Sequence, residues 1–102
     1  MTRGEVWLAE VGRKRRPVLV LTRPEVIDVR ALVTVAEIIT GIRGIGAEVA
    51  VDHRAIGLER ESAVNCDELH TVTQTSLTHR VGRLDDTTMR QVCSAVNYAL
   101  GC

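Results

Sequence analysis

The sequence predicts a mainly β protein, a small and partly open barrel that ends in one α-helix. Three observations support this fold class. Short runs of β-branched residues alternate with turn residues, the clearest helical periodicity lies near the C-terminus, and 102 residues fit one domain spanning 1–102. We therefore expect one sheet against which the helix buries one face.

The strands are predicted from their alternation and their β-branched content. In the first, EVWLAEV, Val6 and Leu8 share one face while Trp7 and Ala9 occupy the other, so both faces are partly apolar. The predicted strands are residues 5–11, 18–22, 31–39, 48–52 and 63–65.

Proline and glycine mark the predicted strand ends and turns. Pro17 and Pro24 bracket the second strand, because strand ends tolerate a missing N–H group. The segment GIRGIG, residues 41–46, predicts a turn, since its glycines do not have the spacing of a dinucleotide-binding or phosphate-binding loop.

The C-terminal segment predicts an amphipathic helix. Asp85 or Asp86 can cap its N-terminus, and Gly101 stands where a helix would end. Apolar residues recur there with helical spacing and define the face that we expect to be buried, namely Met89, Val92, Cys93, Val96 and Leu100.

Composition excludes several classes of protein. With only Trp7 and Tyr98 as aromatic residues, the chain cannot bind RNA by stacking several bases on a sheet. The three cysteines lack the spacing of a disulfide framework or a zinc site, so we predict reduced thiols and no metal or cofactor. No apolar run approaches the roughly 18 residues of a membrane span, and no signal peptide is evident, which predicts a cytoplasmic protein.

The formal net charge of zero hides an asymmetry along the chain. Residues 1–43 carry eight cations against five acids, and residues 44–102 carry five against eight. Five cations lie within GRKRRPVLVLTR, residues 12–23, and twelve of the thirteen cations in the chain are arginine. The guanidinium group pairs well with phosphate, which favours a nucleic acid or phosphate partner. A charged hairpin tip that only improves solubility is the alternative interpretation.

Four blocks in order resemble a known family: RGEVWL at 3–8, RRPVLVLTR at 15–23, SAVNCDELHTV at 62–72, and RVGRLDDTTMRQVCSAVNYALG at 80–101. They are similar to the signature blocks of the MazF/PemK (Kid) toxins. The resemblance implies an SH3-like or CcdB-like, partly open β-barrel with a C-terminal helix, usually a homodimer. It also implies sequence-specific, metal-independent cleavage of single-stranded RNA and neutralisation by a small MazE-like antitoxin.

The chemistry implied by the resemblance is attack of a 2′-hydroxyl on the adjacent phosphorus. Arg16 stands at the family's catalytic arginine position, where a guanidinium can stabilise charge that develops on the phosphate. Asp67 falls where Kid-like members place an acid, so it is a candidate proton acceptor, base reader or orienter of Arg16. The candidate RNA-binding residues are Arg13, Lys14, Arg15, Arg23 and His70.

The family's catalytic threonine is displaced in this chain. An alignment without a gap places Ile39 at that position and Thr40 one residue later. A slip of one residue turns a strand side chain to the opposite face, so either a bulge or a strand that ends at Ile39 brings Thr40 to the site, or the hydroxyl is lost. We favour a catalytic Thr40.

Two function classes remain open on the sequence alone. Arg16 and the Asp67 block favour an endoribonuclease toxin. Ile39 is the best argument for the alternative, which is a non-catalytic CcdB-like gyrase-binding toxin or a degenerate toxin that only binds its antitoxin.

Overall fold

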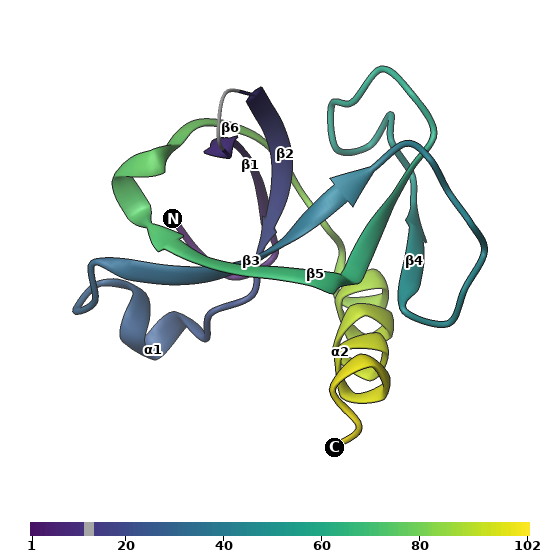
Figure 1. Cartoon of the computed structure of the whole chain (residues 1–102). Coiled ribbons are helices and arrows are strands. Elements are labelled where there is room, and N and C mark those ends of the chain that lie inside the picture. The colour runs from purple at the N-terminus through teal and green to yellow at the C-terminus, as the bar shows by residue number, and fades with distance from the viewer. Residues whose placement is uncertain (12–13) are drawn as a thin grey trace.

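A computed structural model describes residues 1–11 and 14–102 of the chain (Figure 1). Its strands form one antiparallel sheet in the order β4-β5-β3-β2-β1-β6. The elements are β1 (Glu5–Val11), β2 (Lys14–Val20), α1 (Pro24–Ile27), β3 (Leu32–Ile39), β4 (Glu48–Val51), β5 (Ser62–Thr73), a 3₁₀ turn (Gln74–Ser76), β6 (Leu77–Arg83) and α2 (Asp86–Leu100).

The sheet curls without closing, which confirms the predicted, partly open barrel. The edge strands are β4 and β6, and no ladder joins them within the described ranges. Figure 1 shows β5 and β3 crossing below β1 and β2, with α2 beneath the bend in β5. Neither helix in these ranges is long and apolar enough to cross a membrane.

Two apolar clusters lie on opposite faces of the sheet. Leu19 belongs to the cluster that includes Val92 of α2, whereas its neighbours Val18 and Val20 belong to the cluster that includes Ile27 of α1. This follows from strand geometry, because successive side chains point to opposite faces. All three strand residues are fully buried, so this part of β2 is covered on both sides, as its continuous apolar run predicts.

The second strand begins earlier than predicted. Residues 18–22 were expected, but β2 spans Lys14–Val20, so Pro17 lies inside the strand and not at its end. Pro17 faces Leu8 of β1, and pairing of β2 with β3 starts only at Val18. A residue without an N–H group is tolerated there because the strand has a partner on one side alone.

The other differences between the predicted and the observed strands occur in strands with many polar side chains. The predicted strand 63–65 is the start of β5, which continues to Thr73, and β6 was not predicted at all. Both segments expose most of their side chains beyond Cys66 and Leu77, so they lack the apolar run that reveals a buried strand.

The C-terminal helix has the predicted ends. Oδ1 of Asp85 accepts a hydrogen bond from the N–H of Thr88 at 2.7 Å, and this bond lowers the pKa of Asp85. Gly101 ends the helix with φ of 72°, in the left-handed region that glycine adopts without strain. Its buried face differs from the prediction: Ala95 is buried, and Leu100 is 61% exposed because the last turn extends past the sheet (Figure 1).

The loop between β4 and β5, residues 52–61, packs against the far edge of the sheet. Its Ile56 is 2% exposed, and a Cβ added to Gly82 of β6 would lie 2.7 Å from the Ile56 carbonyl oxygen. Within the loop, the N–H of Leu58 donates to the carbonyl of His53 at 2.8 Å. The absence of a side chain at Gly82 therefore lets this loop rest directly on β6.

Glu5 ties the N-terminus to β6 and gives stability a dependence on pH. Its carboxylate accepts hydrogen bonds from Arg80 Nε at 2.6 Å, Thr2 N–H at 2.6 Å and Trp7 Nε1 at 3.3 Å. Burial opposes the charged form, but these donors outweigh it and hold the pKa of Glu5 below its ordinary value of 4.5. A carboxyl group with a depressed pKa stabilises the fold above its unfolded pKa, and the contribution disappears as the pH falls through the folded value.

We therefore expect the free energy of unfolding of Glu5→Gln to fall less than that of the wild type as the pH is lowered. Above pH 5 the variant is less stable than the wild type, by on the order of 1 kcal/mol or less because solvent screens the exposed Arg80. As the pH falls through the folded pKa of Glu5, which lies below 4.5, the stabilities of the two proteins converge. Urea unfolding at several pH values measures this, and a constant difference down to the most acidic pH would contradict the assignment.

Candidate functional site

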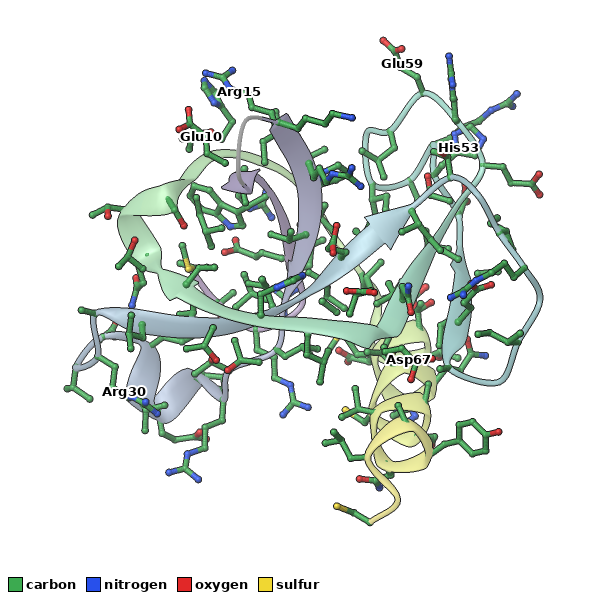
Figure 2. The ribbon with its side chains drawn as sticks, viewed as in Figure 1. Glu10, Arg15, Arg30, His53, Glu59 and Asp67 are labelled. Carbon is green, nitrogen blue, oxygen red and sulfur yellow. The ribbon has the colours of Figure 1, made fainter. Side chains whose placement is uncertain are left out.

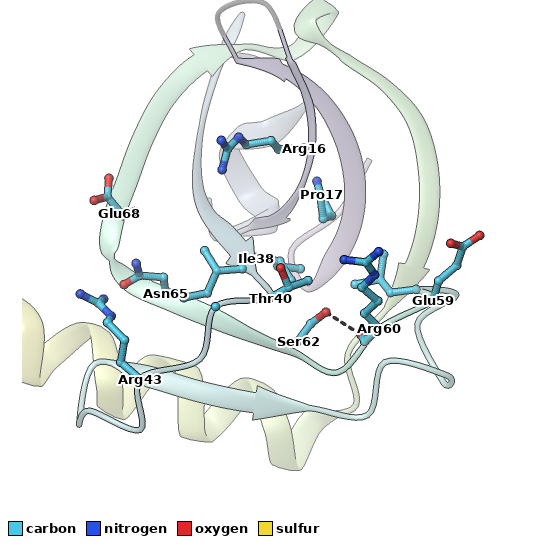
Figure 3. A pocket seen from close by; sticks show the side chains of 13 residues that line it. Arg16, Pro17, Ile38, Thr40, Arg43, Glu59, Arg60, Ser62, Asn65 and Glu68 are labelled. Carbon is cyan, nitrogen blue, oxygen red and sulfur yellow. Dashed lines mark hydrogen bonds between the residues drawn. The ribbon is translucent and has the colours of Figure 1, made fainter.

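A pocket of about 690 Å³ opens where β2 and β3 separate (Figure 3). Pairing between these strands stops at Val18 opposite Glu37, so the preceding part of β2 and the following part of β3 form two facing walls. The 13 lining residues come from β2, the end of β3, β5 and the loops on both sides of β4: Arg16, Pro17, Ile38, Ile39, Thr40, Gly41, Arg43, Leu58, Glu59, Arg60, Ser62, Asn65 and Glu68.

Arg16, which lines this pocket, is paired with a carboxylate of β3. Nη1 of Arg16 lies 3.5 Å from Oε1 of Glu37, and the other oxygen, Oε2, accepts a hydrogen bond from Nε2 of His70 at 2.8 Å. The three residues come from β2, β3 and β5 and share one face of the sheet, since Val18 lies opposite Glu37 and Val35 lies opposite His70. The Glu37 side chain is 13% exposed, so this carboxylate fixes both neighbours in place.

An irregularity in β5 decides which acid faces the pocket. Ala36 pairs with Leu69, but the next residue of β3, Glu37, pairs with Asn65, so three residues of β5 form a bulge. Cys66 points into the core, and burial raises the pKa of its thiol to about 11. Asp67 is exposed, lies beside α2 in Figure 2 and does not line the pocket. Glu68 lines it instead, so the geometry gives no support to a catalytic Asp67.

Thr40 reaches the pocket because β3 ends one residue before it. The strand stops at Ile39, and the exposed Thr40 then lines the pocket beside Ile38 (Figure 3). This is the strand-end arrangement that the sequence left open. Ile39 also lines the pocket, so the two positions that compete for the role of the family's threonine lie next to each other at the site.

The predicted RNA-binding residues are dispersed. Lys14 and Arg15 are exposed at the start of β2, and Figure 2 shows Arg15 beside Glu10 at the tip of the β1–β2 hairpin, outside the pocket lining. Arg23 precedes α1, beyond the other end of β2, about 20 Å from Arg16 along an extended chain. His70 bonds to Glu37 and does not line the pocket. Arg13 lies outside the described residues.

Two arginines of the site were not predicted. Arg43, from the GIRGIG turn, donates from Nε to Oε2 of Glu48 at 2.9 Å. The other oxygen of Glu48 accepts the backbone N–H groups of Arg43 and Gly44, and although burial opposes ionisation, these bonds lower the pKa of Glu48. Arg60 lies in the loop before β5, where its carbonyl accepts a hydrogen bond from the Ser62 hydroxyl at 2.8 Å. The one available sequence signal was a cation in the turn that follows strand 31–39, and it pointed to Arg43.

The pocket combines groups that bind phosphate with groups that move protons. Arg16, Arg43 and Arg60 supply guanidinium donors, and Thr40 and Ser62 supply hydroxyls. The amide of Asn65 and two acids, Glu59 and Glu68, complete the polar lining. A guanidinium group binds phosphate oxygens in a fork, and a carboxylate can accept a proton from a substrate hydroxyl. The arrangement can therefore hold a phosphodiester and deprotonate a group beside it.

Comparisons with known proteins agree with this description. The sequence model of the PemK-like, MazF-like toxin of type II toxin-antitoxin systems matches residues 2–100. The chain is 42% identical over 103 residues to the probable endoribonuclease MazF5 of Mycobacterium tuberculosis, covering 98% of this chain and 93% of that protein. It is 34% identical over 105 residues to the probable endoribonuclease MazF2 of the same organism, with both chains covered completely.

Solved structures share the fold. The Mycobacterium tuberculosis toxin MazF-mt6 superposes with a TM-score of 0.89 at 35% identity, covering 95% of this chain and 96% of that one. An endoribonuclease in complex with its cognate antitoxin, from a mycobacterial species, also superposes with a TM-score of 0.89, covering 99% and 95% of the two chains. At 24% identity the second comparison supports the fold alone.

Proposed function

Because this chain belongs to the PemK-like, MazF-like toxin family of type II toxin-antitoxin systems, we propose that it cleaves single-stranded RNA in the pocket between β2, β3 and β5. The observation that carries the proposal is that Arg16 and Thr40 line one pocket together with Arg43 and Arg60. Curated relatives that are endoribonucleases favour this function over gyrase binding. RNA as the substrate, together with free cysteines, favours the cytoplasm as the site of action.

In the proposed reaction the 2′-hydroxyl of one nucleotide attacks the adjacent phosphorus. The 2′-oxygen forms a bond to phosphorus and the bond from phosphorus to the 5′-oxygen breaks, leaving a 2′,3′-cyclic phosphate and a 5′-hydroxyl. Arg16 donates hydrogen bonds to the non-bridging oxygens as charge develops on them. Its side chain is 44% exposed and lies 3.5 Å from Glu37, so it keeps donors free for a phosphate while Glu37 fixes its direction.

Glu68 is the best placed proton acceptor on the pocket lining. A carboxylate oxygen of Glu68 lies within 4.8 Å of a carboxylate oxygen of Glu37 and of a ring nitrogen of His70, which places it near Arg16. The other acid of the lining, Glu59, lies in the loop before β5. Glu68 would accept the proton of the attacking 2′-hydroxyl, and the same proton can return to the departing 5′-oxygen. This is the role that the sequence assigned to Asp67, one residue earlier.

A cleavage assay in EDTA tests the function directly. Purified protein is incubated with a long RNA of mixed sequence, and the product ends are identified. We expect cleavage at a short sequence, with 2′,3′-cyclic phosphate and 5′-hydroxyl ends. Intact RNA, or cleavage that requires a divalent cation, would contradict the proposal.

We also propose that the active toxin is a homodimer that a MazE-like antitoxin neutralises. Two-fold symmetry would place two copies of the exposed cations of β2, Lys14 and Arg15, on one assembly. A partner that competes with RNA for such a surface is expected to be acidic, and its affinity should fall with added salt.

Substitutions at residues 39 and 40 test which position supplies the hydroxyl. If Thr40 donates to the substrate, Thr40→Val lowers the cleavage rate and Ile39→Thr has little effect. We expect a loss of roughly 10-fold or more, since a hydrogen bond to a charged group is worth about 1.5–3 kcal/mol. The measurement is single-turnover cleavage of a short RNA. A gain of activity in Ile39→Thr with an unchanged Thr40→Val would show that the chain has lost the catalytic hydroxyl.

A further inference from the structure

Three residues beside Arg16 carry ligand atoms for a metal ion. A carboxylate oxygen of Glu37, a carboxylate oxygen of Glu68 and a ring nitrogen of His70 all lie within 4.8 Å of one another. Glu37 comes from β3, and the other two come from β5, on the C-terminal side of its bulge. The chain has no metal-ligand spacing because Glu37 and His70 are 33 residues apart and become neighbours only through the pairing of β3 with β5.

The chemistry of the three donors selects among metal ions. Imidazole suits zinc and similar transition metals, whereas magnesium prefers an octahedral shell of oxygen atoms and retains several waters. Zinc binds imidazole nitrogen and carboxylate oxygen at about 2.0–2.2 Å, so tetrahedral ligands are separated by about 3.4 Å. Oε2 of Glu37 and Nε2 of His70 are 2.8 Å apart, and a small side-chain rotation opens this gap. Glu68 is exposed and free to turn toward the ion.

The two oxygens of Glu37 already have separate partners. Oε2 faces His70, and Oε1 faces Arg16 at 3.5 Å. An ion bound between Oε2 and His70 leaves Oε1 with Arg16, and such an outer contact is the usual way in which a ligating carboxylate is oriented. The positive charge of Arg16 weakens binding, but two carboxylates offset both that charge and one charge of the ion. The ion takes the place of the proton on Nε2 of His70, the ring nitrogen that faces Glu37.

We propose that Glu37, Glu68 and His70 form a zinc site and that its occupation inhibits the toxin. The three protein ligands leave the fourth tetrahedral position to water. Bound zinc takes the carboxylate of Glu68, which then no longer accepts a proton, and holds Glu37 in a new arrangement beside Arg16. The binding site is independent of the activity, whereas the inhibition rests on the proposed RNA cleavage.

Zinc binding is measured first, without RNA. The full chain carries Cys93→Ser and Cys102→Ser, which removes the two thiols that are accessible to metals. We expect one Zn²⁺ per chain by isothermal titration calorimetry, and a Kd at least tenfold weaker in His70→Gln and in Glu68→Gln. Asp67→Asn, an exposed acid in the same bulge, is the matched control and keeps the parent affinity.

Cobalt substitution provides a second, spectroscopic readout. Co²⁺ at this site gives visible bands without the near-ultraviolet charge-transfer band of thiolate ligands, and the bands are lost in His70→Gln. Each variant is first checked by thermal unfolding. If one of them fails to fold, the other still tests the site, because the two ligands differ in chemistry and lie at separate positions of β5. Absence of saturable binding, or an unchanged Kd in both variants, would overturn the proposal.

The cleavage assay is then repeated with increasing Zn²⁺. The concentration that halves the cleavage rate should match the Kd from calorimetry and should rise at least tenfold in His70→Gln. Zinc binding that depends on His70 and Glu68 in a chain that cleaves no RNA would retain the site and refute the function. Cleavage that is unaffected by saturating Zn²⁺ would refute the inhibition alone.

Discussion

Glu68→Gln is expected to slow RNA cleavage by about 10²- to 10⁴-fold, the range associated with a positioned general base. The substitution keeps the size of the side chain and removes its ability to accept the 2′-hydroxyl proton. Because Glu68 is exposed and makes no hydrogen bond in the described part of the chain, the folded state should lose little stability. Single-turnover cleavage of a short RNA measures the effect.

The matched control is Asp67→Asn, which changes the neighbouring acid. Asp67 is exposed on the bulge, its N–H donates to Oδ1 of Asn65 at 3.1 Å, and its side chain does not line the pocket. The variant should therefore cleave RNA at nearly the wild-type rate. The opposite outcome, a collapse of activity in Asp67→Asn with an unaffected Glu68→Gln, would restore the assignment made from the sequence.

Arg16→Ala should reduce cleavage by about 10²- to 10³-fold, the usual loss when one preorganised donor to a developing charge is removed. The rate constant should fall more than the affinity for RNA, because Arg43 and Arg60 still line the pocket. Arg16 is exposed at the edge of β2, so its removal leaves the core intact. Equal rates for Arg16→Ala and the wild type would place the reaction elsewhere.

Arg15→Ala separates catalysis from general attraction to RNA. Arg15 is also exposed on β2, but it adjoins Glu10 of β1 and lies outside the pocket lining. We expect Arg15→Ala to weaken RNA binding and to lower the slope of log affinity against log salt concentration by about 1, as for the loss of one phosphate contact. The cleavage rate at saturating RNA should change little. A loss in the saturated rate as large as that of Arg16→Ala would show that the effect is not specific to the pocket.

The parts of the fold that follow local rules could be predicted from the sequence. The caps of α2, Asp85 and Gly101, were predicted because a capping side chain and a left-handed glycine have strong local signatures. The strand 31–39 was located to within one residue because its alternating and β-branched residues bury both faces. Arg16 and Thr40 were selected through the family resemblance, and both line the pocket.

The remaining site residues depend on non-local pairing. A bulge of three residues shifts the phase of β5, and no rule of alternation indicates where such a shift occurs, so the sequence does not indicate that Glu68 lines the pocket and Asp67 does not. In the sequence Glu37 is one polar residue in an apolar strand. Its role depends on the pairing of β3 with β2 and β5, which places Arg16 and His70 at its two oxygens. Arg60 lies in a loop whose position depends on the packing of Ile56, which has no local signature.

The contact between Ile56 and Gly82 links the pocket to the integrity of the barrel. Among the described residues no ladder joins the edge strands β4 and β6, and the loop that follows β4 rests on β6 at Gly82. The same loop carries Leu58, Glu59 and Arg60 into the pocket wall. The position of this pocket wall therefore depends on how closely the Ile56 backbone packs on Gly82, so a side chain added at residue 82 would displace the wall together with the loop.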